Sequence, residues 1–235
     1  MILRCLIAVA VIVMTMGGGD VGGSASAAEV ESAMARGGRL YDNWYKEKKL
    51  DRPEKAHAAY PADGKYPKQS WRCKECHGWD YRGKDGASAK TDHNIGVKGI
   101  NGAIGKDPAA VAAIFRDKTH GYAPEQLNDK DVQDLALFVS KGQMDTSKFI
   151  DPATGKPKGN AAKGEIYFNT LCAGCHGLDG KKVSTGVPLG QAADNPWDML
   201  HKAFNGLPAE AMPALRSLDP SIASDTVAYT QSLPK

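Results

Sequence analysis

The pentapeptide Cys-x-x-Cys-His occurs twice in this 235-residue chain, at 73–77 and at 172–176, and a glycine follows each copy. The signals around the two copies also repeat, over residues 38–141 and again over 164–233. Such self-similarity is typical of a duplicated structural unit. A chain of this length can form one large domain or two small ones, and the repeat favours two.

The predicted helices recur in the same order in both copies. An N-capping side chain followed by proline, at 107–108 and at 195–196, predicts the start of a helix. A final helix is predicted over 129–140 and over 221–232 from its apolar periodicity. The side chains expected to face the core from these last helices are Val132, Leu135, Phe138, Val139, Ile222, Val227 and Tyr229. Because the strand signal is weak, we expect an all-α fold.

The two copies differ in length at their beginnings. Gly38 and Gly164 each open a predicted helix, whose aromatic side chain is expected to pack against the last helix. Gly164 lies shortly before Cys172, whereas Gly38 precedes Cys73 by about 27 residues more. The first copy therefore contains an insertion near 46–70, which its prolines and glycines predict to be an ordered loop.

Residues 151–163 are rich in Pro, Gly, Lys and Thr and show no apolar periodicity, which is typical of a surface linker. The predicted division is a first domain over 29–150, this linker, and a second domain over 164–235. The net charge of +3 gives no support for nucleic-acid binding.

Residues 1–28 have the pattern of an export signal: a basic start, an apolar run and a small-residue cleavage site. The run is shorter than the roughly 20 residues that span a bilayer, so membrane attachment is expected only if the signal stays uncleaved or through a membrane-bound partner. Cleavage removes Cys5 and leaves four cysteines. The predicted location is the periplasm.

Cys-x-x-Cys-His is the attachment signature of c-type haem, in which both thiols bond to the porphyrin and the histidine binds iron. Two disulfides, a thioredoxin-like redox pair or half of a zinc site are the alternatives. Two copies with histidine behind an export signal favour two haem c groups. The predicted covalent and proximal residues are Cys73, Cys76, His77, Cys172, Cys175 and His176.

The sixth iron ligands are predicted by aligning the two copies. Met212 precedes Leu218 by six residues, and His120 precedes the equivalent Leu127 by seven. We therefore expect Met212 on the second haem and His120 on the first. Met144 competes for the first haem but lies beyond its last helix; the remaining alternatives there are His93, His57 or an open site.

Three further side chains have a possible place beside a haem. Trp71 and Trp79 flank the first motif and are expected to pack on the macrocycle or shield its edge. His201 could bond a propionate, although we expect it to be a partly exposed helix residue.

With these motifs in view, residues 35–235 resemble class I c-type cytochromes in tandem, the dihaem cytochromes of bacterial respiratory chains. The resemblance implies an all-α domain around each haem, and a carbonyl of Pro188 bonded to the ring of His176. The first half departs from the family by its insertion and by His120 in place of methionine. Thiosulfate dehydrogenases are similar, but they use a distal cysteine, and once the signal with Cys5 is removed this chain has no cysteine outside its two motifs.

The expected function is electron transfer between a protein donor and a protein acceptor of a respiratory chain, which makes the chain a carrier rather than an enzyme. The alternative is a dihaem oxidoreductase acting on a small inorganic substrate or peroxide at an open haem. Because methionine opposite histidine raises a haem potential and two imidazoles leave it lower, we expect a low first potential and a high second one.

Overall fold

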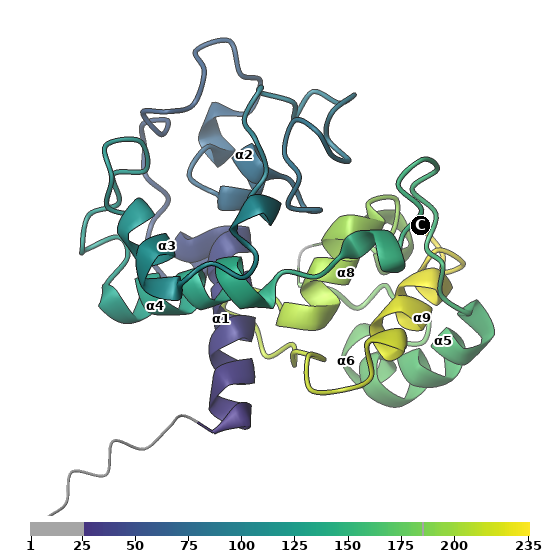
Figure 1. Ribbon diagram of the computed structural model, residues 1–235. Coiled ribbons are helices and arrows are strands. Elements are labelled where there is room, and N and C mark those ends of the chain that lie inside the picture. Colours follow the sequence, from purple (N-terminus) through teal and green to yellow (C-terminus); the bar gives the residue numbers. More distant parts are fainter. Residues whose placement is uncertain (1–25, 185) are drawn as a thin grey trace, which may run out of the picture.

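The computed structural model describes residues 26–184 and 186–235, and the described chain is helical, with strand pairing limited to two isolated bridges. The helices (Figure 1) are α1 (Ala27–Glu47), α2 (Cys73–His77), α3 (Pro108–Ile114), α4 (Asp129–Leu137), α5 (Ala161–Tyr167), α6 (Ala173–His176), α7 (Leu189–Ala192), α8 (Pro196–Asn205) and α9 (Pro220–Thr230). A π-helical turn extends α4 over Phe138–Gly142, and another extends α5 over Phe168–Cys172.

Helix α1 begins earlier than the sequence predicted. Ser26 caps it by accepting a hydrogen bond from the backbone N–H of Glu29, whose side chain bonds back to Ser26. The predicted start at Gly38 is therefore wrong, because Gly38 lies in the middle of the helix. Residues 1–25 of the predicted export signal lie outside the described residues. Within the part that the structure describes, no helix is long and apolar enough to cross a membrane.

The two proline-marked helix starts are confirmed. The carboxylate of Asp107 accepts the backbone N–H of Ala109 at the start of α3, and Asn195 accepts that of Asp198 at the start of α8. Each cap supplies a partner for a backbone donor that the first turn leaves free. The prolines that follow occupy the first helical position, where their missing N–H costs nothing.

Two hydrophobic clusters form the core. The first joins α1, α3 and α4 around Leu40, Tyr41, Leu135 and Phe138, and the rings of Tyr41 and Phe138 lie 5.5 Å apart as predicted. All four predicted core side chains of α4 and its π-turn are buried.

The second cluster lies between α8 and α9, around Leu200, Phe204 and Val227. Only Val227 of the three predicted α9 core residues is fully buried; Ile222 and Tyr229 are half-buried. Ala223 and Thr230, three or four residues from Val227, are buried instead. Residues 223–227 are all buried, so α9 is enclosed between α5 and α8 and does not present the single apolar face that was predicted.

The residues just before the predicted linker already pack in the second cluster and no longer in the first. Met144, Phe149 and Ile150 all pack against the second cluster. A bridge between Ile150 and Pro157 then ties the next turn to this half. The packing therefore divides the chain before Met144, earlier than the predicted boundary at residue 150.

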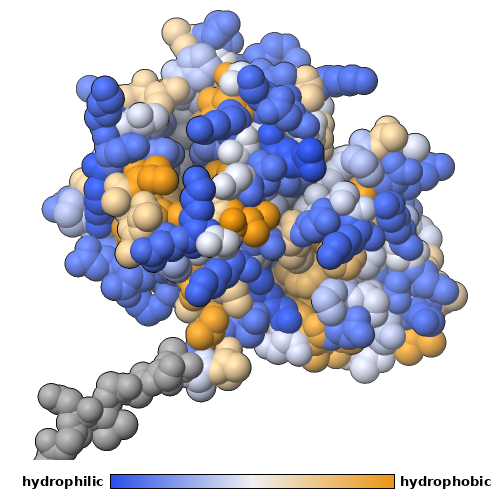
Figure 2. Space-filling view, in the orientation of Figure 1, coloured by the Kyte–Doolittle hydropathy of each residue, from blue (hydrophilic) through white to orange (hydrophobic). Residues whose placement is uncertain are grey.

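Helix α1 packs against α4 of the first half and against α8 of the second (Figure 1). The helices approach closely at Gly38, where an added Cβ would lie 2.2 Å from the Asn205 side chain. Arg39 donates to the carbonyl of Asn205, and Arg216 donates to the carbonyl of Gly142. The two halves therefore form one packed unit. Figure 2 shows that apolar patches interrupt the hydrophilic surface of both.

Candidate haem-binding sites

The first motif is carried by α2, which leads directly out of the inserted loop. Its thiols are free, and burial raises the pKa of Cys73 to about 11 and that of Cys76 to about 12. Cys172 and Cys175 are free as well, so the structure contains neither of the two alternative disulfides. Within residues 26–184 and 186–235, no cluster of three His, Cys, Asp or Glu side chains could hold a metal ion.

The structure brings His77 and His120 together, although 42 residues of chain separate them. Their rings are nearly parallel, with an interplanar angle of 23° and ring centres 6.3 Å apart. Two imidazoles that share one metal, with metal–nitrogen bonds of about 2 Å, have ring centres roughly 6 Å apart. The observed separation of 6.3 Å therefore fits two imidazoles that hold one metal between them.

The outer nitrogens of both rings are already bonded. His77 Nδ1 lies 2.8 Å from the carbonyl of Lys98, which can only accept, so His77 carries its proton on Nδ1. His120 Nδ1 lies 3.2 Å from the carboxylate of Asp117. These bonds leave the two Nε2 atoms available to a metal, and burial lowers the pKa of His77, which favours the neutral, ligating form.

The loop that carries His120 is a tight turn after α3. Asp117 accepts the backbone N–H groups of Thr119 and His120 and the ring of His120 on one carboxylate oxygen. These backbone bonds lower the pKa of Asp117 and keep it charged. Gly121, at φ 58°, turns the chain so that Tyr122 enters the first cluster.

The competing ligands for the first site lie elsewhere. Met144 packs on the second cluster, away from the histidine pair. His93 is bonded to the buried carboxylate of Glu75 and stacks on Tyr66. Both ring nitrogens of His57 are already bonded, Nδ1 to the backbone N–H of Ala59 and Nε2 to the carbonyl of His120, so neither is free for a metal.

The second motif spans the π-turn after α5 and helix α6. Burial raises the pKa of Cys172 to about 11 and lowers that of His176. The Nδ1 atom of His176 is buried and has no hydrogen-bond partner among the described residues. The predicted partner is wrong, because the carbonyl of Pro188 accepts the backbone N–H groups of Gln191 and Ala192 at the start of α7.

Large apolar side chains around the second motif are left in contact with solvent. Five of them are more than a third exposed, namely Ile166, Leu171, Leu178, Val187 and Leu218. Exposed apolar surface of this extent marks a place where another group binds. Together with the free thiols, it fits a bulky apolar group held at this motif.

Met212 lies on the loop between α8 and α9. There it lines a surface hollow of about 540 Å³ together with Arg39 and Glu47 of α1 and with Arg216. Its role as the distal ligand of the second haem stays a prediction.

His201 and the two tryptophans have roles that the sequence did not reveal. His201 is 1% exposed rather than partly exposed. Its Nε2 lies 2.9 Å from the carbonyl of Gly38, and its Nδ1 lies 2.8 Å from the hydroxyl of Tyr81. Trp79 touches this ring, whereas Trp71 packs in the first half against Trp44.

Residues 159–229 match the family described as Cytochrome C oxidase, cbb3-type, subunit III. The C-terminal part of the chain is therefore a cytochrome c domain, which implies at least one haem c. No curated protein is similar enough to match. A chain of the Kuenenia stuttgartiensis reducing HAO-like protein complex aligns over 79% of this chain and 100% of its own, at 15% identity. With a TM-score of 0.27, that alignment carries no argument.

Proposed function

We propose that this chain is an exported dihaem c-type cytochrome that transfers electrons between a protein donor and a protein acceptor of a respiratory chain. One haem would be bonded to Cys73 and Cys76, and the other to Cys172 and Cys175. The observation that carries the proposal is the near-parallel pair of His77 and His120, spaced as two ligands of one metal.

Haem c supplies a one-electron couple between ferric and ferrous iron. The residues of this chain hold it and control its environment. In the first half, the bonds to Lys98 and Asp117 orient His77 and His120, so neither imidazole has to reorganise when the iron changes charge. A site with both axial positions filled favours electron transfer over substrate chemistry.

The second half supports the same function through its family match. His176 would be the proximal ligand there and Met212 the distal ligand. A thioether opposite an imidazole gives a higher potential than two imidazoles. We therefore expect two well-separated potentials in one molecule, the lower belonging to the half with the histidine pair.

The proposed periplasmic location rests on the export pattern of residues 1–28 and on the fact that c-type attachment suits an exported protein. The proposed partners are proteins, because a relay of single electrons needs a donor and an acceptor that dock and leave. Neither nucleic-acid binding nor a membrane span of its own is part of the proposal.

The test is to express the full chain with its leader in a host that attaches haem c, and to measure its mass and its oxidised spectrum. We expect the added mass of two haems and a fully low-spin spectrum, followed by two waves in a redox titration. A mass without two haems would refute the proposal. A high-spin band in the untreated protein would instead favour the oxidoreductase that acts at an open haem.

A further inference from the structure

We infer that the inserted loop of the first half is a clamp, in which His57 positions the loop of the distal ligand His120 and keeps that ligand from leaving the iron. The inference rests on the proposed function, since it takes His77 and His120 as a ligand pair. It assigns a purpose to the predicted insertion near 46–70, which in the structure forms the connection 48–72 between α1 and α2 and has no counterpart in the second half.

The hydrogen bonds of His57 fix both its tautomer and its target. Its Nδ1 lies 3.1 Å from the backbone N–H of Ala59 and can only accept there. Nε2 therefore carries the proton and donates to the carbonyl of His120 at 2.9 Å.

The clamp itself is braced inside the loop. The hydroxyl of Ser70 accepts the backbone N–H of His57 at 2.8 Å and donates to the carbonyl of Pro67 at 2.7 Å. Trp71, next in the chain, packs its ring against the His57 ring with centres 4.5 Å apart. The indole of Trp71 also donates to the carbonyl of Lys55. His57 is thus held from both ends of the inserted loop.

The body of the first half anchors the loop in turn. The indole of Trp44, on α1, donates to the carbonyl of Trp71 at 2.9 Å. Arg72 forms an ion pair with the buried carboxylate of Asp42, which also lies on α1. The clamp therefore connects the part of α1 on either side of its kink at Asn43 with the loop of His120.

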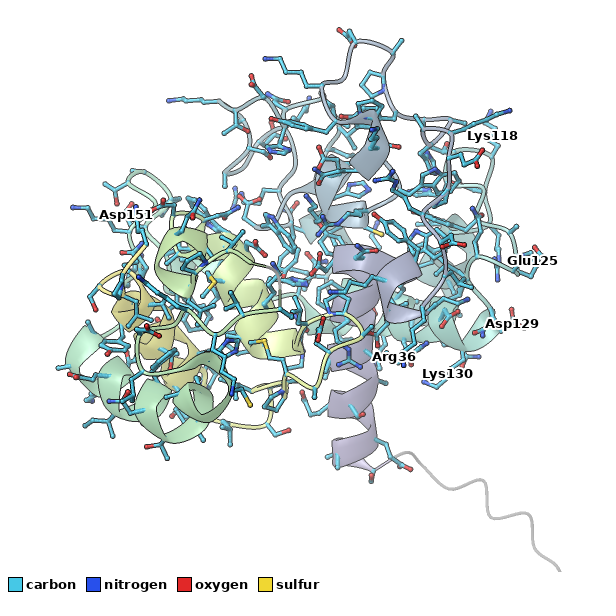
Figure 3. The ribbon with its side chains drawn as sticks, turned by 180° about the vertical axis from the view of Figure 1, so that it is seen from behind. Arg36, Lys118, Glu125, Asp129, Lys130 and Asp151 are labelled. Carbon is cyan, nitrogen blue, oxygen red and sulfur yellow. The ribbon has the colours of Figure 1, made fainter. Side chains whose placement is uncertain are left out.

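The ligand loop needs such support because it lies at the outside of the molecule. Lys118 and Glu125, which bracket His120 in the chain, project from the outer flank of the first half, opposite Asp151 of the other half (Figure 3). The side chain of His120 is 29% exposed, and among the described residues its one side-chain hydrogen bond is to the exposed Asp117. Without the bond from His57, His120 would be held by Asp117 and by the contact of its ring with Phe115.

The second half provides the contrast. There α5 continues through the π-turn into Cys172, so no inserted loop exists to reach over the motif. The predicted distal ligand Met212 follows α8 on a loop of its own. We therefore expect the first haem to resist ligand exchange and the second haem to lack this restraint.

The test measures how fast carbon monoxide binds to the reduced holoprotein, since it must displace the distal ligand. His57→Phe keeps the aromatic packing and removes the donated hydrogen bond. We expect it to bind carbon monoxide at the first haem about tenfold faster, the factor that corresponds to the roughly 1.4 kcal/mol of one buried hydrogen bond. His57→Gln, which retains an N–H donor, should restore most of the slow rate.

Two controls distinguish the loss of the His57 hydrogen bond from a general destabilisation of the first half. His93→Phe replaces another histidine of the same half that bonds to Glu75 instead of the ligand loop, and it should leave the rate unchanged. The carbon monoxide phase of the second haem should not change in any of these variants. If His57→Phe does not fold, Ser70→Ala removes only the brace and should accelerate binding in the same direction.

Failure of the clamp can be told from failure of the proposed function. If His120→Ala leaves the first haem low-spin, His120 is no ligand and the pairing with His77 is wrong. If His120→Ala gives a high-spin haem but His57→Phe and Ser70→Ala bind carbon monoxide at the unaltered rate, the ligand assignment stands and the clamp is refuted.

Discussion

His201 joins the two halves through a buried imidazole, and replacing it should change how stability depends on pH. Its ring accepts the hydroxyl of Tyr81 and donates to the carbonyl of Gly38, so it must be neutral to make both bonds. Burial lowers its pKa to about 4. An imidazole in the unfolded chain has a pKa near 6.5.

The direction in which stability changes with pH follows from how many protons the folded and the unfolded states bind. Between these two pKa values the unfolded state binds more protons than the folded one, so stability falls as the pH falls. At about 1.4 kcal/mol per pKa unit, the His201 contribution shrinks by about 2 kcal/mol between roughly pH 7 and pH 5. Below the folded pKa no further loss is expected from this group.

The variant His201→Gln retains one donor and one acceptor but does not titrate. Because it cannot reach both partners, we expect a loss of about 1–3 kcal/mol near neutral pH. That deficit should narrow by about 2 kcal/mol near pH 5, where the original histidine is weakened. Urea unfolding of the holoprotein, followed by far-ultraviolet circular dichroism at both pH values, measures the two differences.

Tyr81→Phe is the matched control. It removes the bond to His201 Nδ1 and should lower stability, yet it leaves the imidazole and therefore the pH slope in place. The other buried histidines contribute equally to all three proteins and cancel in the comparison. Parallel curves for the original protein and His201→Gln would refute the assignment of a depressed pKa at this position.

Three further predictions concern the ligands and the packing. Visible spectra should show a high-spin haem in His120→Ala but not in Met144→Ala, which packs on the other cluster. Asp117→Asn should raise the lower potential in a redox titration, because the ligand imidazole loses an anionic partner. Gly164→Ala should lower the free energy of thermal unfolding by about 1–3 kcal/mol, since its Cβ would lie 1.9 Å from the carbonyl of Asp225, whereas the control Gly102→Ala, with no atom within 4 Å, should leave it nearly unchanged.

Much of the helical order was accessible from the sequence because its signals are local. A capping side chain before proline fixes a helix start wherever it occurs, and the starts of α3 and α8 were predicted in this way. The pairing of His77 with His120 was foreshadowed by internal alignment, because duplicated units place equivalent loops at equivalent sites. Nothing in the family match tests that pairing, and it stays a prediction about the loaded protein.

What the sequence concealed depends on contacts between distant segments. Nothing near His201 shows that Tyr81 and Gly38 of the other half will enclose it, so it was expected to be partly exposed. The buried residues of α9 were mispredicted because the helix packs on two sides, against α8 at Ala223 and against α5 at Gly164, and apolar periodicity does not register the close approach at Gly164. His57 was similarly hidden, since its bond to the His120 carbonyl spans 63 residues.

Because α1 crosses α8 closely at Gly38 and also packs against α4, this one helix belongs to the core of both halves. Proteolytic cleavage within 151–158 would consequently leave two fragments that stay associated, because the contacts of α1 with α8 hold the halves together and not the chain connection. Neither half can tilt relative to the other without moving α1, so the spacing between the two Cys-x-x-Cys-His segments is set by helix packing. Replacing one half with a domain from another protein would require a new packing interface along α1.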